Sequence, residues 1–112
     1  MLDVRLYAPR ASVVIVWASG ELDILAADVL ADQVEQQVAR AGDVVLDLCN
    51  VSVVGPAGVD VLRRLRKEAA QVGVRVHLAA EEESVRSCLA EAALDDDAIH
   101  HSAAAAIARL PL

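Results

Sequence analysis

The chain contains few aromatic and few lysine side chains. Its 112 residues include one Trp, one Tyr, no Phe and one Lys, and the formal net charge is −7. Proteins that bind nucleic acid contact the phosphates with clustered positive charge and stack single-stranded bases on aromatic rings. The composition therefore argues against nucleic acid as a partner.

The sequence also lacks long uncharged runs and paired cysteines. Its longest uncharged stretch, residues 48–59, has twelve residues, whereas a membrane-spanning helix needs about 18. No basic segment precedes an apolar run at the N-terminus, so we expect no signal peptide. Cys49 and Cys88 form neither a C-x-x-C unit nor a disulfide framework. We expect a cytoplasmic protein that does not insert directly into a membrane.

Small and β-branched apolar residues make up much of the chain. Apolar residues account for 56% of it, including 22 Ala, 18 Val and 14 Leu. A chain of this length is expected to form one domain, residues 1–112, with enough apolar material to fold without disulfides. Such side chains are typical of a sheet packed closely under Ala-rich helices.

The apolar periodicity alternates between that of strands and that of helices. Two adjacent strands near the N-terminus predict a hairpin, and the later alternation implies a mostly parallel sheet. The predicted fold class is α/β, with the order β-β-α-β-α-β-α-β-α and a mixed, mostly parallel sheet packed with helices. A loop is expected at Asn50–Pro56, and Val29 and Val72 are expected on buried helix faces. The expected strands are residues 3–8, 12–18, 44–48, 74–78 and 98–100, and the expected helices are residues 26–41, 56–72, 82–93 and 103–109.

No catalytic or phosphate-binding motif occurs in the chain. It has no G-x-S-x-G, G-x-G-x-x-G or G-x-x-x-x-G-K-[ST] segment. The acidic run Asp95–Asp97 lacks the glycine and distal Glu of a calcium loop, and Cys49 is better interpreted as a small buried thiol than as a nucleophile. We expect no enzyme activity, no metal and no cofactor. The thiols and imidazoles whose spacing matches no zinc pattern are Cys49, His77, Cys88, His100 and His101.

One succession of segments is more specific than the rest. Gly20-Glu21-Leu22-Asp23 precedes the first helix, Val44-Val45-Leu46-Asp47-Leu48 follows it, and Gly58 stands at the start of the next, Arg-rich helix. This order resembles the STAS domain, the family of sulfate-transporter and anti-sigma-factor-antagonist domains, over nearly the whole chain. Residues 85–95 look like the family's third helix and the turn after it.

The resemblance implies regulatory binding rather than catalysis. Stand-alone members bind an anti-sigma factor that is also a protein kinase, and so free a sigma factor. The kinase phosphorylates a serine in an Asp-Ser-Ser-Gly sequence at the start of the second helix, and the partner is released. A phosphate of about −1.5 to −2 charge is tolerated at a helix N-terminus but repels a partner docked there. The partner-binding residues implied here are Asp23, Val54, Gly55, Pro56, Ala57, Gly58, Val59, Asp60 and Arg63.

This chain departs from the family pattern at the phosphorylation site. Gly55-Pro56-Ala57-Gly58 stands where the family has Asp-Ser-Ser-Gly. The acceptor position falls on Ala57, which has no hydroxyl, whereas Pro56 still suits the first turn of a helix because its φ is preset. We therefore expect no phosphorylation switch at Ala57.

Several interpretations stay open at the level of the sequence. In the first interpretation, the domain binds its partner constitutively. In the second, binding is switched at another hydroxyl such as Ser52. In the third, the domain serves another assembly, for example as a soluble subunit that regulates a membrane transporter. Ser52 is more simply explained as a loop hydroxyl bonded to local backbone, Asp23 as a cap of the first helix, and the stripe of Asp60, Arg63 and Lys67 as a solvated helix face. An enzyme or small-ligand binder would need a deep polar pocket. The oligomeric state is left open.

Overall fold

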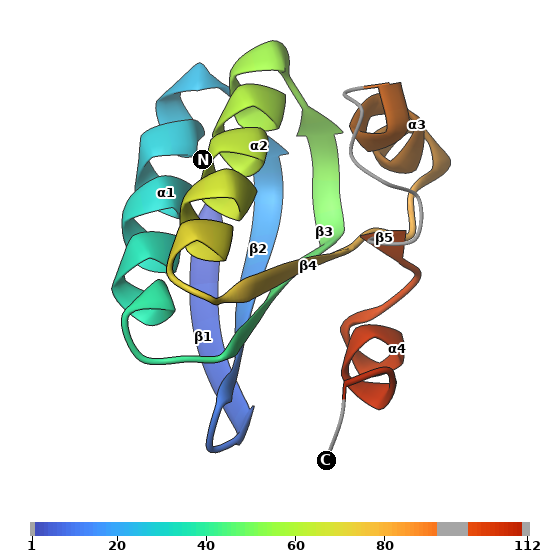
Figure 1. Ribbon diagram of the computed structural model, residues 1–112. Coiled ribbons are helices and arrows are strands. Elements are labelled where there is room, and N and C mark those ends of the chain that lie inside the picture. Colours follow the sequence, from blue (N-terminus) through green and yellow to red (C-terminus); the bar gives the residue numbers. More distant parts are fainter. Residues whose placement is uncertain (1, 92–98, 111–112) are drawn as a thin grey trace.

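The computed structural model describes residues 2–91 and 99–110, which form a five-stranded sheet and four helices (Figure 1). The strands lie in the order β1-β2-β3-β4-β5, with β1 antiparallel to β2 and the other neighbours parallel. The strands are β1 (Asp3–Arg10), β2 (Val13–Leu22), β3 (Asp43–Val54), β4 (Arg75–Ala79) and β5 (Ile99–His100). The helices are α1 (Ile24–Val38), α2 (Pro56–Gln71), α3 (Glu83–Glu91) and α4 (Ala103–Ala108).

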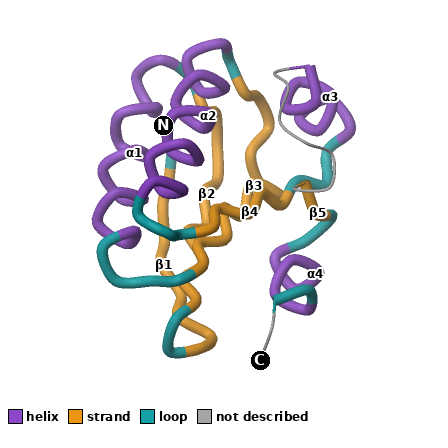
Figure 2. Tube along the Cα trace, in the orientation of Figure 1, coloured by secondary structure: helices purple, strands orange, loops and turns teal. Residues whose placement is uncertain are grey.

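Helices cover both faces of the sheet. α1 and α2 lie side by side over one face (Figures 1 and 2), where Val44 and Leu62 belong to the main hydrophobic core. On the opposite face, Ala106 of α4 packs in a smaller cluster with Val45. Val44 and Val45 belong to different clusters because successive side chains of a strand point to opposite faces. Burial on both sides explains why residues 44–46, near the start of β3, are apolar without interruption.

The predicted order of elements and the N-terminal hairpin are confirmed. The predicted loop at Asn50–Pro56 is wrong, because β3 continues to Val54 and β2 continues to Leu22. The two strands stay paired as far as Leu22 opposite Val54, with register shifts on both sides of the segment that contains Gly20, whose φ is 118°. Such irregularities let long strands bend without separating. Residues 92–98, where the predicted third helix ends and the Asp95–Asp97 turn follows, lie outside the described residues.

The buried faces of α1 and α2 differ from the predicted ones at two residues. Val29 and Val72 are exposed, whereas Ala27 and Ala31 of α1 are buried. The apolar periodicity is compatible with more than one rotation of the helix about its axis. In the observed rotation, the alanines of α1 face the sheet. The small side chains let the helix axis approach the β-branched strand residues closely. Val72 follows the last residue of α2 as its C-cap and so lies beyond the packed face.

Arg86 ties α3 to the ends of β4 and β5. Its Nη1 donates to the carbonyl oxygens of Ala80 at 2.9 Å and His100 at 3.2 Å, and its Nη2 lies 3.4 Å from the Ile99 oxygen. A guanidinium has enough donors to hold several carbonyls at once. This contact secures a two-residue strand that has little backbone pairing of its own.

A buried carboxylate lies at the beginning of β3, on the face that α4 covers. Arg75 Nε donates to Asp43 Oδ1 at 2.9 Å, Arg75 Nη2 donates to Oδ2 at 3.1 Å, and His77 Nε2 lies 2.9 Å from Oδ1. Burial alone would raise the pKa of Asp43, but the hydrogen bonds and charges of His77 and Arg75 lower it below 3.8 overall. The folded state therefore favours the ionised carboxylate.

We predict that acid destabilises the fold in two stages. Burial lowers the pKa of His100 below 6.5, and the charges of His77, Arg109 and Arg86 lower it further. Folding favours the neutral ring, so this contribution is complete above pH 6.5 and is lost as the pH falls through the folded-state pKa. The contribution of Asp43 is complete above pH 3.8 and is lost at lower pH.

The first stage is measured by urea unfolding at about pH 7.5 and about pH 5. The His100→Gln variant should lose less unfolding free energy between these two pH values than the wild type, because it has no ring to protonate at this position. An equal loss in both proteins would contradict the assignment.

Candidate functional site

The starts of α1 and α2 lie side by side, directly after the C-terminal ends of β2 and β3. At the first start, Asp23 caps α1: its Oδ1 accepts a hydrogen bond from the Ala26 N–H at 2.9 Å. The capping interpretation of Asp23 is therefore confirmed. Because the carboxylate of Asp23 is also exposed, it remains available to a visiting molecule.

The second helix begins without a side-chain cap. Gly55 has the extended backbone of an N-cap, and its N–H donates to the Leu22 carbonyl at 3.0 Å. Pro56 follows in the first turn, where its missing N–H leaves no donor unsatisfied. The predicted helix start at Pro56 is confirmed, and the backbone bond from Gly55 holds it to the end of β2.

Gly58 permits a close approach between α2 and β2. A Cβ atom at this position would lie 2.8 Å from both the carbonyl oxygen and Cγ of Leu22. Real Cβ atoms do not come this close to backbone, so any side chain here would move α2 away from the strand. The glycine that the sequence places at the helix start therefore serves packing.

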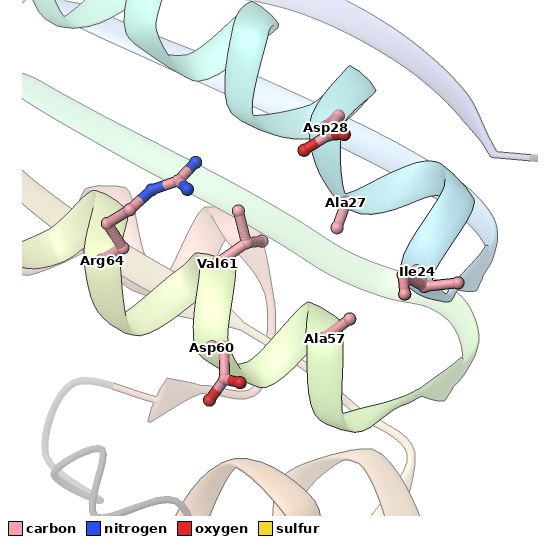
Figure 3. A pocket seen from close by; sticks show the side chains of 7 residues that line it. All are labelled: Ile24, Ala27, Asp28, Ala57, Asp60, Val61 and Arg64. Carbon is pink, nitrogen blue, oxygen red and sulfur yellow. The ribbon is translucent and has the colours of Figure 1, made fainter.

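A shallow groove of about 320 Å³ separates the first turns of the two helices. Figure 3 shows Ile24 and Ala57 at the end nearest the helix starts, with the methyl of Ala57 directed into the space between α1 and α2. Arg64 extends toward α1 at the other end. The groove is lined by Ile24, Ala27, Asp28, Ala57, Asp60, Val61 and Arg64.

The two helices that form the groove carry opposite charge. α1 has three acidic residues and no basic one, and α2 has four basic residues and two acidic ones. Arg63 lies 3.7 Å from Asp60 and Arg64 lies 3.6 Å from Glu68, but these ion pairs are solvent-exposed and contribute little to stability. A surface with acid on one side and base on the other favours one orientation of a docked protein. The charged residues are Asp28, Asp32 and Glu35 on α1, and Asp60, Arg63, Arg64, Arg66, Lys67 and Glu68 on α2.

The structure narrows the surface predicted from the sequence. The side chains of Val54 and Val59 are buried, as is Gly58, so these residues shape the site without being accessible to a partner. The exposed and half-exposed members of the predicted set are Asp23, Gly55, Pro56, Ala57, Asp60 and Arg63.

Two aliphatic side chains at the start of α1 were missing from the predicted set. Ile24 is 74% exposed and Leu25 is 82% exposed. The sequence could have indicated these two residues, because large apolar side chains that lie off the buried face of a helix are exposed and can contact a partner. Arg64 was also missed, and its role in lining the groove follows only from the position of α1.

Ser52 lies near the site on the exposed part of β3. Its Oγ donates to the Gly20 carbonyl of the neighbouring strand β2 at 3.3 Å, so the hydroxyl bonds to backbone as predicted, but from a strand and across 32 positions rather than locally within a loop. It also lines a cavity of about 230 Å³ with residues of α3, among them Ser84 and Cys88. The Cys88 Sγ lies 3.4 Å from the Val54 oxygen and joins α3 to the end of β3.

The described residues show no constellation suited to catalysis. Burial raises the pKa of the Cys49 thiol to about 12, with a further contribution from Asp47, so this thiol is protonated at neutral pH. No group of three His, Cys, Asp or Glu side chains suitable for a metal ion occurs within residues 2–91 and 99–110. No helix in the same ranges is long and apolar enough to cross a membrane.

A family model for the STAS domain matches residues 8–106 of the chain. The chain belongs to the STAS domain family. This match confirms the resemblance drawn from the order of the Gly-Glu-Leu-Asp segment, the third strand and the second helix. Among curated proteins, none matches the chain.

Solved structures share the fold of this STAS domain at low sequence identity. An anti-sigma factor antagonist from Mycobacterium paratuberculosis has a TM-score of 0.86 at 20% identity, covering 96% of this chain and 92% of that one. The Bacillus cell fate determinant SpoIIAA in its phosphorylated form has a TM-score of 0.77 at 17% identity, covering 97% and 100%. The murine anion transporter Slc26a9 matches with a TM-score of 0.75 at 19% identity, covering 88% of this chain but 18% of the transporter.

We predict that Gly58→Ala destabilises this STAS domain by about 1–3 kcal/mol, as overpacked sites do. Helix propensity alone would favour the alanine by about 1 kcal/mol, so a net loss of stability would come from the contact with Leu22. Urea unfolding measures the change. Gly42→Ala is the control, because its Cβ would meet its nearest neighbours at 3.7 and 3.8 Å. Equal stability of Gly58→Ala and wild type would contradict the close approach.

Proposed function

We propose that this chain is a regulatory protein-binding module that acts as an anti-sigma-factor antagonist. Its partner, an anti-sigma factor or a related protein, binds the surface formed by the starts of α1 and α2. The proposal rests on the apolar end of the groove between these helices, where Ile24 is exposed and the Ala57 methyl faces the cavity. The fold it shares with antagonists of known structure supports the same assignment.

The shape and chemistry of the groove favour a docked protein over a small substrate. It is shallow and has an apolar end, and its charged side chains, Asp28, Asp60 and Arg64, are solvated. Small-molecule sites are enclosed pockets with convergent polar groups, and no such arrangement lines this groove. We therefore infer binding rather than catalysis as the function.

We further propose that partner binding is not released by phosphorylation at position 57. Ala57 occupies the acceptor position of the family pattern and contributes a methyl group to the groove. Without a hydroxyl, no phosphate ester forms there, so the complex persists until another signal acts. Among the nearby hydroxyls, Ser52 is exposed and is the candidate for such a signal.

We predict that Ala57→Asp weakens binding to the cognate anti-sigma factor by about tenfold or more, since it places an unpaired carboxylate in the docked surface. The folded domain should tolerate the change, because an acidic residue in the first turn of a helix is favourable. Calorimetric titration against candidate anti-sigma factors measures the affinity. Ala104→Asp is the matched control, since it adds the same charge at an exposed site in the first turn of α4. Equal affinity of Ala57→Asp and wild type would refute the docking surface.

We predict that a kinase-type anti-sigma factor with ATP adds no phosphate to residues 53–62, which contain no hydroxyl. Ala57→Ser should accept one phosphate under the same conditions, and mass spectrometry of peptides would locate it. Phosphate on Ser52 of the wild type would place the switch on β3, and Ser52→Ala would then remove it. If Ala57→Ser accepts no phosphate from any kinase that binds the domain, the proposed docking of the kinase at the start of α2 is contradicted.

A second function, regulation of a membrane transporter by a separate STAS subunit, is favoured by the similarity to the transporter structure. The two functions differ in where the partner is found. Affinity capture from separated cytosolic and membrane fractions distinguishes them: an anti-sigma factor in the cytosolic eluate supports the first, and a permease or transport ATPase in the membrane eluate supports the second.

A further inference from the structure

Exposed large hydrophobic side chains concentrate at one edge of the molecule. Of the seven found among residues 2–91 and 99–110, four belong to β1 and the outer side of α1. Leu25 and Val29 also line a cavity of about 360 Å³ with Leu2, the residue before β1. Leu6 and Tyr7 are successive residues of β1 and therefore point to opposite faces of the sheet. The edge strand thus exposes an apolar side chain on each face, and exposed apolar surface of this kind marks a site of interaction. The four exposed fractions are Leu6 42%, Tyr7 50%, Leu25 82% and Val29 48%.

This edge of the sheet is also open. β1 pairs with β2 alone and forms the outermost strand (Figure 2). The backbone N–H and C=O groups on its outer side have no strand to bond, and such an edge is a template for a further strand. Within the described residues, no other part of the chain covers the exposed apolar side chains of this edge or forms a further strand beside β1.

We propose that a second copy of the chain covers this edge, with the two β1 strands pairing antiparallel around Leu6. Because the two-fold axis makes the contact the same on both copies, the assembly closes as a dimer. The two sheets then form one continuous sheet, and Leu25 and Val29 lie next to the joint. This inference does not depend on the proposed partner of the groove.

The side chains of β1 favour this register over its neighbours. With Leu6 opposite Leu6 of the second copy, Arg5 lies opposite Tyr7 and Val4 lies opposite Ala8. Arg5 already stacks over the ring of Trp17 at 5.4 Å, and its contact with a second aromatic ring would be of the same favourable kind. A shift of one pairing step toward the N-terminus would instead place Arg5 opposite Arg5, and like charges directly opposite are destabilising.

Charge favours the antiparallel direction. Asp3 begins β1 and Arg10 ends it, so antiparallel strands bring unlike charges near each other at both ends, whereas parallel strands would align like charges. Pro9 has no N–H to donate and ends the ladder after Ala8. The groove between α1 and α2 lies on the other side of α1 and stays accessible, so the dimer would present two docking surfaces.

The test is the mass of the protein in solution from about 10 µM to about 1 mM, by sedimentation equilibrium. We expect the wild type to dimerise and Leu6→Lys to weaken the dimer about tenfold or more, because two lysines meet at the axis. Val72→Lys is the matched control: Val72 is 66% exposed and lies at the end of α2, so this variant should dimerise as the wild type does. A wild-type monomer at every concentration overturns the proposal, as does a dimer that Leu6→Lys leaves intact.

A second variant tests the register even if Leu6→Lys fails to fold. Opposed residues of antiparallel strands have Cα atoms about 4.5–5.5 Å apart, within the range of a disulfide. Under mild oxidation, Leu6→Cys should form a covalent dimer, whereas Val4→Cys should not exceed the background set by the two native cysteines. Equal cross-linking of the two variants overturns the register and with it the proposal.

Discussion

The contact between the end of β2 and the start of α2 determines the geometry of the whole site. The Leu22 carbonyl accepts the hydrogen bond of Gly55 and also lies where a side chain on Gly58 would have to be. This contact brings the first turn of α2 down onto the strand that leads into α1. The two helix starts therefore lie side by side, and the absence of a Cβ at Gly58 permits the close approach of α2 to β2. The Leu22 carbonyl thus contributes both to the packing of α2 and to the geometry of the candidate site.

The chemistry of the groove follows from what Ala57 and Gly55 lack. In the family pattern, a serine and an acidic residue occupy these positions, and a phosphate changes the charge of the helix start. Here the helix begins with a backbone hydrogen bond and a proline, and a methyl group faces the groove. Neither change disturbs the helix, because Pro56 has no N–H to satisfy in the first turn and the Gly55 N–H is bonded to the Leu22 carbonyl. The proposed loss of the phosphorylation switch is therefore compatible with an intact helix start and groove.

The molecule has two separate surfaces with different physical character. The groove carries acid on α1, base on α2 and an apolar end, which suits a partner held in one orientation. The edge formed by β1 and the outer side of α1 is apolar and has unpaired backbone, which suits a strand. Both surfaces share α1, whose two exposed stripes face in different directions. Small alanines on the buried side of α1 hold this helix close to the sheet and so fix the positions of both surfaces.

The order of elements, the hairpin, the helix cap at Asp23 and the absence of a hydroxyl at Ala57 follow from the sequence, because local periodicity, capping chemistry and side-chain identity determine them. The length of β3 did not, since its pairing with β2 as far as Val54 is a long-range interaction that overrides the local loop composition. Nor did the exposure of Val29 or the burial of Val59, because both depend on how far each helix is rotated about its axis against the sheet. The groove itself was decided by tertiary structure alone: Ile24 and Arg64 are 40 residues apart in the chain, and only the packing of α1 beside α2 brings them to the same cavity.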